Sequence, residues 1–155
     1  MAFVYTVVSD KDTHFTTALA QNASESENLL LPTALDGVNG NARSIIRGIT
    51  VISDQNLDWQ LVFFNSDTFV NADIDLNTAI ASYKFTASTD ALQVGGSGSY
   101  YYFKDGLNLP YLDADNTGEL HVLLVNRSAT GKNAGATGEV VIKVHMEPPG
   151  FGVNA

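Results

Sequence analysis

The chain has 155 residues, no cysteine and a formal net charge of −9, from 17 acidic and 8 basic side chains. This length suits one domain with one full-sized core, and a hydrophobic content of 45% predicts a folded chain rather than a disordered one. Without cysteine there is no disulfide, thiolate metal ligand or cysteine nucleophile. Because few Lys and Arg are present to neutralise phosphates, we expect neither nucleic acid nor an anionic membrane surface as a partner.

The first ten residues, MAFVYTVVSD, lack the basic start and the long apolar run of a signal peptide. No stretch approaches the roughly 18 uninterrupted apolar residues of a transmembrane helix. We therefore expect a soluble protein that is made in a cytoplasm.

Short runs rich in Val, Ile, Thr and aromatic residues, bounded by Gly, Asn, Asp and Ser, predict β-strands. Six such runs lie at residues 2–8, 44–53, 58–65, 99–104, 119–126 and 139–146. The polar sequence DQNL between the second and third runs has the length of a hairpin turn. The last two runs are expected to form a hairpin with a long loop.

Apolar residues alternate with polar ones in several of these runs, which predicts strands with one buried face. The predicted buried faces are Trp59, Leu61 and Phe63; Leu120, Val122 and Leu124; and Val140, Ile142, Val144 and Met146. In residues 119–126 the opposite face, which carries His121, Leu123 and Val125, is also partly apolar. That strand is therefore expected to be covered on both sides, as in a sheet centre or an interface.

The connections between the predicted strands are long. Residues 22–43 are expected to be one connection, within which NLLLP (28–32) is left as loop or as an added edge strand. Residues 75–85 fit either a helix or a short strand, and residues 15–23 are equally ambiguous. Residues 107–118 are expected to form a turn-rich excursion.

Many strands, long loops and little helix predict an all-β fold, a single-domain, jelly-roll-like antiparallel β-sandwich. The domain is predicted to span residues 1–147. Residues 148–155 are predicted to be a C-terminal tail, because Pro148 and Pro149 have no N–H for sheet hydrogen bonds.

The stretch NRSATGKNAGATGEV (126–140) contains a Gly-Lys pair among small residues and resembles a phosphate-binding loop. That motif requires glycine five residues before Gly131 and Ser or Thr after Lys132, followed by a helix. The chain has Asn126 and Asn133 at these positions, and a strand follows. We interpret the stretch as a long loop between two strands.

The sequence DADNTG places Asp113, Asp115 and Gly118 at the spacing that opens a calcium-binding loop. The bidentate glutamate of that motif is missing, because its position is Leu124 inside a predicted strand. The pattern favours a turn capped by Asp and Asn. Whether the loop at Asp113–Asp115 binds calcium is left open.

Asp73 and Asp75, near Asp67, offer paired carboxylates of the kind that glycosidases use. Carboxylates two residues apart on a strand point the same way and usually face water, so we expect no catalysis here. The sequence GGSGS (95–99) lacks the strand-then-helix context of a serine nucleophile elbow.

The three histidines are His14, His121 and His145. His121 and His145 are expected on neighbouring strands, on the face opposite the main core, where they could approach each other. A zinc site needs three or four ligands, and the spacing fixes no third one. We interpret them as surface or interface residues, and we assign no catalytic, cofactor-binding or metal-binding residue and no cofactor.

The densest aromatic cluster is SYYYF (99–103). Tyr100 and Tyr102 share one face of the predicted strand, and Tyr101 and Phe103 share the other. One pair is expected in the core. The exposed pair would suit either sugar stacking or a protein interface, and we favour the interface.

Two segments, SIIRGITVISDQNLDWQLVFFN and GELHVLLVNRSATGKNAGATGEVVIKVHMEP, resemble parts of the small jelly-roll head decoration, or cement, proteins of tailed bacteriophages. The resemblance covers strands between residues 44–65 and 118–147. It implies a jelly roll that forms trimers and sits on the capsid exterior, where it bridges major capsid subunits. The family has no catalytic residues to carry over.

The sequence thus leads to a non-enzymatic structural protein of a viral particle, which stabilises the shell through contacts with the major capsid protein and with itself as a homotrimer. Its expected location is the virion exterior. The alternative is a carbohydrate-binding, lectin-like β-sandwich that uses Tyr100–Tyr102 and the Asp-rich loops, with or without calcium.

Overall fold

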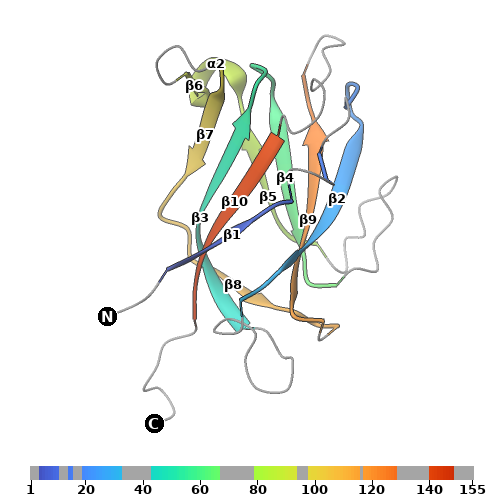
Figure 1. Ribbon diagram of the computed structural model, residues 1–155, viewed down its shortest axis with the longest axis vertical. Helices are drawn as coiled ribbons and strands as arrows, with labels where there is room; N and C mark the ends of the chain where they lie inside the picture. The colour runs from blue at the N-terminus through green and yellow to red at the C-terminus, as the bar shows by residue number, and fades with distance from the viewer. Residues whose placement is uncertain are drawn as a thin grey trace.

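The computed structural model is a sandwich of two antiparallel β-sheets (Figure 1). It describes residues 4–10, 14–15, 19–32, 43–66, 79–93, 98–115, 117–128 and 140–148. The strands are β1 (Tyr5–Val8), β2 (Ser24–Leu30), β3 (Arg43–Ser53), β4 (Trp59–Phe64), β5 (Ala79–Phe85), β6 (Leu92–Gln93), β7 (Tyr100–Lys104), β8 (Leu109–Leu112), β9 (Glu119–Asn126) and β10 (Val140–Glu147). Within these ranges, the helical turn α2 (Ala87–Asp90) is the only helix, and none is long and apolar enough to cross a membrane.

The order of the strands is that of a jelly roll. Sheet A has the order β1-β10-β3-β7-β6, with β8 also pairing with β3, and sheet B has the order β2-β9-β4-β5. The chain pairs like one long antiparallel hairpin: β1 with β10, β2 with β9, β3 with β7, and β4 with β5. These pairs are divided between the two sheets, so the hairpin rolls around a common core. The predicted fold class is confirmed.

The core lies between the sheets and takes one face of each long strand. The predicted inward faces are confirmed, since these residues are all buried: Trp59, Leu61, Phe63, Leu120, Val122, Leu124, Val140, Ile142, Val144 and Met146. A strand with period two can bury only one side in a two-layer sandwich. The alternation in β10 is complete along its whole length.

β9 is buried on both faces, as its composition predicts. Every residue of β9 after Glu119 is buried. On the outer face of sheet B, Leu123 and Val125 pack with Val62 and Phe64 of β4 in a second apolar cluster. A strand between two neighbours has both of its edges paired as well, so β9 has no exposed backbone edge.

Three segments that were predicted as connections or left ambiguous contain strands. Residues 22–43 are not one connection, because Ser24–Leu30 forms β2, an edge strand of sheet B. The ambiguous segment 75–85 is a strand where the structure describes it, over Ala79–Phe85. The excursion at 107–118 contains β8, which pairs with the first half of β3.

The first half of β2 is not predicted as a strand from the sequence, because polar residues occupy its inward positions. Glu25 lies opposite Leu124, and Glu27 lies opposite Val122, so both point to the inner side of sheet B. Their carboxylates accept backbone hydrogen bonds there, from the N–H of Phe15 at 3.0 Å and from that of Asp10 at 2.9 Å. These hydrogen bonds lower the cost of placing polar groups on the inner side of the sheet. The two glutamates interrupt the alternation of apolar and polar residues by which a strand is predicted.

The two predicted hairpins are both wrong. β3 and β4 lie in different sheets, and so do β9 and β10. After β3 the chain crosses from sheet A to sheet B, and the hydroxyl of Tyr102 holds this crossing by accepting from the N–H of Leu57 at 3.1 Å and donating to its C=O at 2.6 Å. In a jelly roll several connections join strands of different sheets, so strands that are neighbours in sequence are not always neighbours in a sheet.

The parts of the chain outside the described ranges include several predicted features. These are residues 67–78 with their acidic cluster, most of the GGSG joint, residues 129–139 of the long loop and residues 149–155 of the tail. The structure therefore leaves the domain limits 1–147 and the tail 148–155 as predictions.

Substitution of Glu27 tests the cost of a carboxylate inside the sandwich. Burial is the main cause that raises the pKa of Glu27 above its ordinary value of 4.5, against the hydrogen bond from Asp10 and the charge of His14, which lower it. A raised pKa means that the folded state binds this proton more tightly, so the stabilising contribution exists below pH 4.5 and is lost as the pH rises through the folded pKa.

We therefore expect Glu27→Gln to raise the urea midpoint at about pH 7, with a gain that shrinks as the pH falls towards the carboxyl pKa. Gln keeps the oxygen that accepts from Asp10. Glu25→Gln is the matched control, because that carboxylate also accepts a backbone N–H but is 26% exposed. Equal gains in the two variants, or a gain independent of pH, would contradict this account of Glu27.

Candidate functional site

The turn between β8 and β9 brings its two aspartates, Asp113 and Asp115, close to a buried histidine, His121. One ligand atom from each of Asp113, Asp115 and His121 lies within 4.8 Å of the other two. The Nε2 atom of His121 is 3.2 Å from Oδ1 of Asp113 and 3.3 Å from Oδ1 of Asp115. His121 and Asp113 are fully buried, whereas the Asp115 side chain is 20% exposed.

Asp113 is positioned by the backbone of the turn that it begins. Its Oδ2 accepts hydrogen bonds from the N–H of Gly118 at 2.7 Å and of Glu119 at 3.3 Å. Gly118 has a φ of +75°, a conformation that glycine adopts without strain. This is the Asp-capped turn that the sequence favours, and it leaves the other carboxylate oxygen of Asp113 directed at His121.

His121 is oriented from its opposite side by β2. Asn28 lies directly opposite His121 in the β2–β9 register, and its Oδ1 is 2.8 Å from Nδ1 of the imidazole. An amide oxygen can only accept a hydrogen bond, so Nδ1 carries a proton. The imidazole therefore bridges β2 and the Asp113 turn.

The expectation that His121 and His145 lie on neighbouring strands is wrong. His121 belongs to β9 in sheet B and His145 to β10 in sheet A, where its ring nitrogens are each 3.2 Å from a threonine hydroxyl, of Thr6 and Thr50. The error follows from the hairpin that β9 and β10 do not form. The carboxylates that do lie near His121 belong to the sequence DADNTG, whose first residue, Asp113, is eight positions before the histidine.

Tyr111, at the same end of the sandwich, is part of the core. Its hydroxyl donates to the carbonyl of Glu119 at 2.6 Å. Burial, followed by the charge of Asp113, raises the pKa of Tyr111 far above its ordinary value. Tyr111 therefore stays protonated and keeps β8 fastened to the start of β9.

The aromatic cluster of β7 divides as the alternation requires. Tyr102 is fully buried and Tyr100 packs against the core, so Tyr102 cannot serve as an exposed sugar platform. Tyr101 and Phe103 face outward and stack, with ring centroids 6.2 Å apart and an interplanar angle of 14°. Phe103 is 48% exposed.

The outer face of sheet A carries an apolar strip, here called the outer apolar row, that crosses four strands. Its members lie opposite one another in the register, Leu92 with Tyr101, Tyr101 with Ile52 and Ile52 with Val141, and Phe103 stacks on Tyr101. Directly opposite residues on one face of a sheet are in contact distance. Leu92 is 55% exposed, and the other members of the row are partly exposed.

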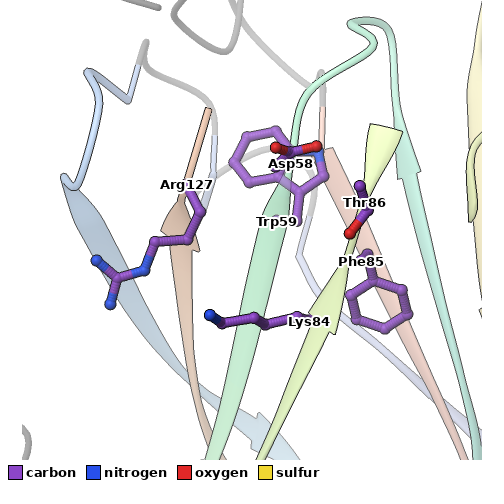
Figure 2. Close-up of a pocket in the computed structure, with 6 residues that line it drawn as sticks. All are labelled: Asp58, Trp59, Lys84, Phe85, Thr86 and Arg127. Carbon is purple, nitrogen blue, oxygen red and sulfur yellow. The ribbon is translucent and has the colours of Figure 1, made fainter. Parts of the chain in front are cut away.

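A pocket of about 300 Å³ lies where β4, β5 and the end of β9 come together, lined by Asp58, Trp59, Lys84, Phe85, Thr86 and Arg127. Figure 2 shows the ends of Lys84 and Arg127 on one side and the ring of Phe85 on the other. Asp58 accepts from the N–H of Ala87 at 2.6 Å, and Arg127 donates to Gln60 at 2.7 Å.

The architecture places the chain in the class of all-β proteins with two antiparallel sheets in jelly-roll order. No protein-family model matches the chain, and no curated protein matches it. Among solved structures, it is similar to a chain of tomato aspermy virus, a structure determined by X-ray crystallography, with 11% identity and a TM-score of 0.49 over 99% of this chain and 81% of that chain. At these values the similarity assigns neither a family nor a function.

Proposed function

We propose that the chain is a structural protein of a viral particle, a capsid decoration or cement protein that acts through protein–protein contacts on the capsid exterior. The observation that carries this proposal is the outer apolar row of sheet A. A contiguous exposed apolar patch on a small protein is typical of an interaction surface, and aromatic residues are enriched in such surfaces.

The partner of the outer apolar row is a second copy of the chain within a homotrimer. Interfaces between permanently associated subunits are more apolar than those of transient complexes, and the row combines two stacked aromatic rings with three aliphatic side chains. Contacts with the major capsid protein then use other surfaces. The net charge of −9 supports an exterior position, because an acidic subunit does not bind packaged nucleic acid.

Phe103→Asp is expected to convert the trimer to monomers in size-exclusion chromatography with light scattering, because it places a charge on the outer apolar row. Leu30→Asp is the matched control, since Leu30 is 76% exposed on β2 of sheet B and lies outside the row. Circular dichroism checks that both variants fold. A monomeric wild type, or an equal loss of association in the control, would overturn this role of the row.

Decoration itself is tested by adding the purified protein to capsids that lack it and sedimenting the mixture. We expect cosedimentation and a higher temperature of capsid disruption. A protein that neither associates with itself nor sediments with capsids is not a cement protein.

Carbohydrate binding is the second candidate, and the near-parallel stack of Tyr101 and Phe103 favours it. Flat aromatic faces are suited to stacking on sugar rings. The Phe103→Asp variant distinguishes the two functions: glycan binding by a monomeric wild type, lost in this variant, favours the lectin alternative. Loss of association without any glycan binding favours the structural protein.

A further inference from the structure

We propose that Asp113, Asp115 and His121 bind a divalent transition-metal ion, with zinc as the ion that fits best, and that this ion fastens one end of the sandwich. The proposal is independent of the viral role. It departs from the sequence interpretation, which assigned no metal-binding residue and left only calcium open at this loop.

The first argument is the arrangement of atoms around the imidazole. Nδ1 of His121 lies 2.8 Å from Oδ1 of Asn28, so Nε2 is the ring nitrogen that faces Asp113 and Asp115. The side chains of His121 and Asp113 are fully buried. A ring nitrogen and two carboxylate oxygens that converge in this way are of the types that a transition-metal ion takes as ligands.

The separations between these atoms suit the ligands of a metal ion. A charge-assisted N–H···O bond is typically about 2.7–2.9 Å long, whereas Nε2 lies 3.2 Å and 3.3 Å from its two carboxylate oxygens. Two ligands of a tetrahedral zinc ion, with bonds of about 2.0–2.1 Å, are separated by roughly 3.3 Å. The two nearly equal separations therefore match ligand–ligand edges better than they match one strong hydrogen bond.

The orientation of the ligands is already set by neighbouring groups. Asp113 is held through Oδ2 by backbone N–H groups, so that Oδ1 faces the imidazole. Asp115 accepts from the hydroxyl of Thr117 at 3.0 Å. Histidines that bind metals commonly donate their other ring N–H to an oxygen, and Asn28 supplies that oxygen here.

The ligand types select zinc rather than calcium. Calcium takes six to eight oxygen ligands, and a site with an imidazole nitrogen at its centre suits zinc and related first-row ions. Two carboxylates and a neutral imidazole carry a charge of −2, which a divalent ion balances. The partial exposure of Asp115 leaves a path for the ion and a position for water as the fourth ligand.

The location gives the ion a structural role. Asp113 follows β8, which pairs with β3 of sheet A, and His121 lies in β9 of sheet B beside β2. An ion held by both would connect the two sheets directly. Binding to the folded state alone stabilises it, by about 2.7 kcal/mol at a free concentration of 100 times Kd.

The test uses the untagged full chain, stripped with EDTA and titrated with zinc by calorimetry. We expect one zinc ion per chain, a higher melting temperature with zinc than with EDTA, and visible absorption bands of tetrahedral cobalt when Co²⁺ replaces zinc. Calcium is titrated in parallel, and it should bind more weakly than zinc.

Asp115→Asn should weaken zinc binding by more than about 100-fold, because it replaces a carboxylate ligand by a neutral amide while the partly exposed position tolerates the change. Asn28→Ala, which removes a positioning residue, should weaken binding by about 10–100-fold. Asp54→Asn is the control for charge, since Asp54 is exposed and lies after β3, outside the cluster. The melting temperature of each variant in EDTA reports on folding separately from binding.

Three results would overturn the proposal. If zinc and cobalt change neither the heat signal, nor the melting temperature, nor the visible spectrum of the wild type, the three side chains form a hydrogen-bonded cluster that binds no metal. Zinc binding that Asp115→Asn and Asp54→Asn reduce equally would place the ion elsewhere. Calcium binding tighter than zinc binding would exclude the imidazole-centred site.

Discussion

Replacement of Phe63 by alanine is expected to cost about 3–5 kcal/mol of the free energy of unfolding. Phe63 is fully buried on the inner face of β4 and packs edge-to-face on Tyr83, with ring centroids 6.1 Å apart. It lies opposite Val122 of β9, in the centre of sheet B, so the sheet cannot collapse around the missing ring. Since domains of this kind are stable by about 5–15 kcal/mol, the variant loses a large share of its stability.

The same substitution at Phe103 is the matched control for this prediction. Phe103 is 48% exposed on the outer face of sheet A, and removing its ring opens no cavity in the core. Surface changes usually fall within about 0.5 kcal/mol. Urea unfolding of both variants, at a concentration low enough to keep the protein monomeric, measures the difference. Equal losses at the two positions would mean that Phe103 belongs to the folded core.

Tyr102→Phe is expected to cost about 1–3 kcal/mol at neutral pH, because the substitution removes the hydroxyl that donates to the carbonyl of Leu57. The N–H of Leu57 keeps its other partner, the carbonyl of Gln55 at 3.1 Å. The hydroxyl both accepts from and donates to this one residue, in the crossing from β3 to β4. The side chain volume is otherwise unchanged. The effect is therefore that of the hydrogen bonds at the crossing, measured by urea unfolding at neutral pH.

The advantage of Tyr102 over phenylalanine should disappear at high pH. Burial is the main cause that raises the pKa of Tyr102 from 10.0 to about 12. Between pH 10.0 and about 12 the folded state keeps the phenolic proton of Tyr102 while the unfolded state loses it. The stabilisation that comes from the raised pKa is therefore complete below pH 10.0 and declines as the pH rises to about 12. The decline amounts to about 1.4 kcal/mol per pH unit.

Urea unfolding of wild type and Tyr102→Phe at several pH values, together with the ultraviolet absorbance of tyrosinate, measures this loss. The other tyrosines are common to both proteins, so the difference in stability isolates Tyr102. A constant difference across the window would contradict the raised pKa.

Strand positions could be predicted from the sequence wherever apolar and polar residues alternate against a single core. β4 and β10 lie within one residue of their predicted limits, and their inward faces are those that alternation selects. β2 was missed over its first half because Glu25 and Glu27 occupy inward positions, where one oxygen of each carboxylate accepts a backbone N–H. β8 was missed because its four residues include a proline, Pro110.

The candidate metal site could be predicted only in part. The spacing of Asp113, Asp115 and Gly118 marks a turn, and the structure has that turn. Nothing in the spacing indicates that His121 points back to the two carboxylates or that Asn28 fixes its ring. His121 stands in an apolar strand, where a buried histidine and a solvent-facing one have the same pattern.

The alternation of residues is enough to show that this protein is all-β, which residues of its main strands are inward, and that β9 is covered on both faces. These properties are local, because a strand turns every second side chain to the same side. The pairing of the strands depends on contacts between residues far apart in the chain, and the structure was needed to show that β3 and β4, like β9 and β10, lie in different sheets. The same fold brings Asn28 of β2, His121 of β9 and Asp113 of the turn before β9 together, and it places Tyr101 and Phe103 on the outer face of sheet A.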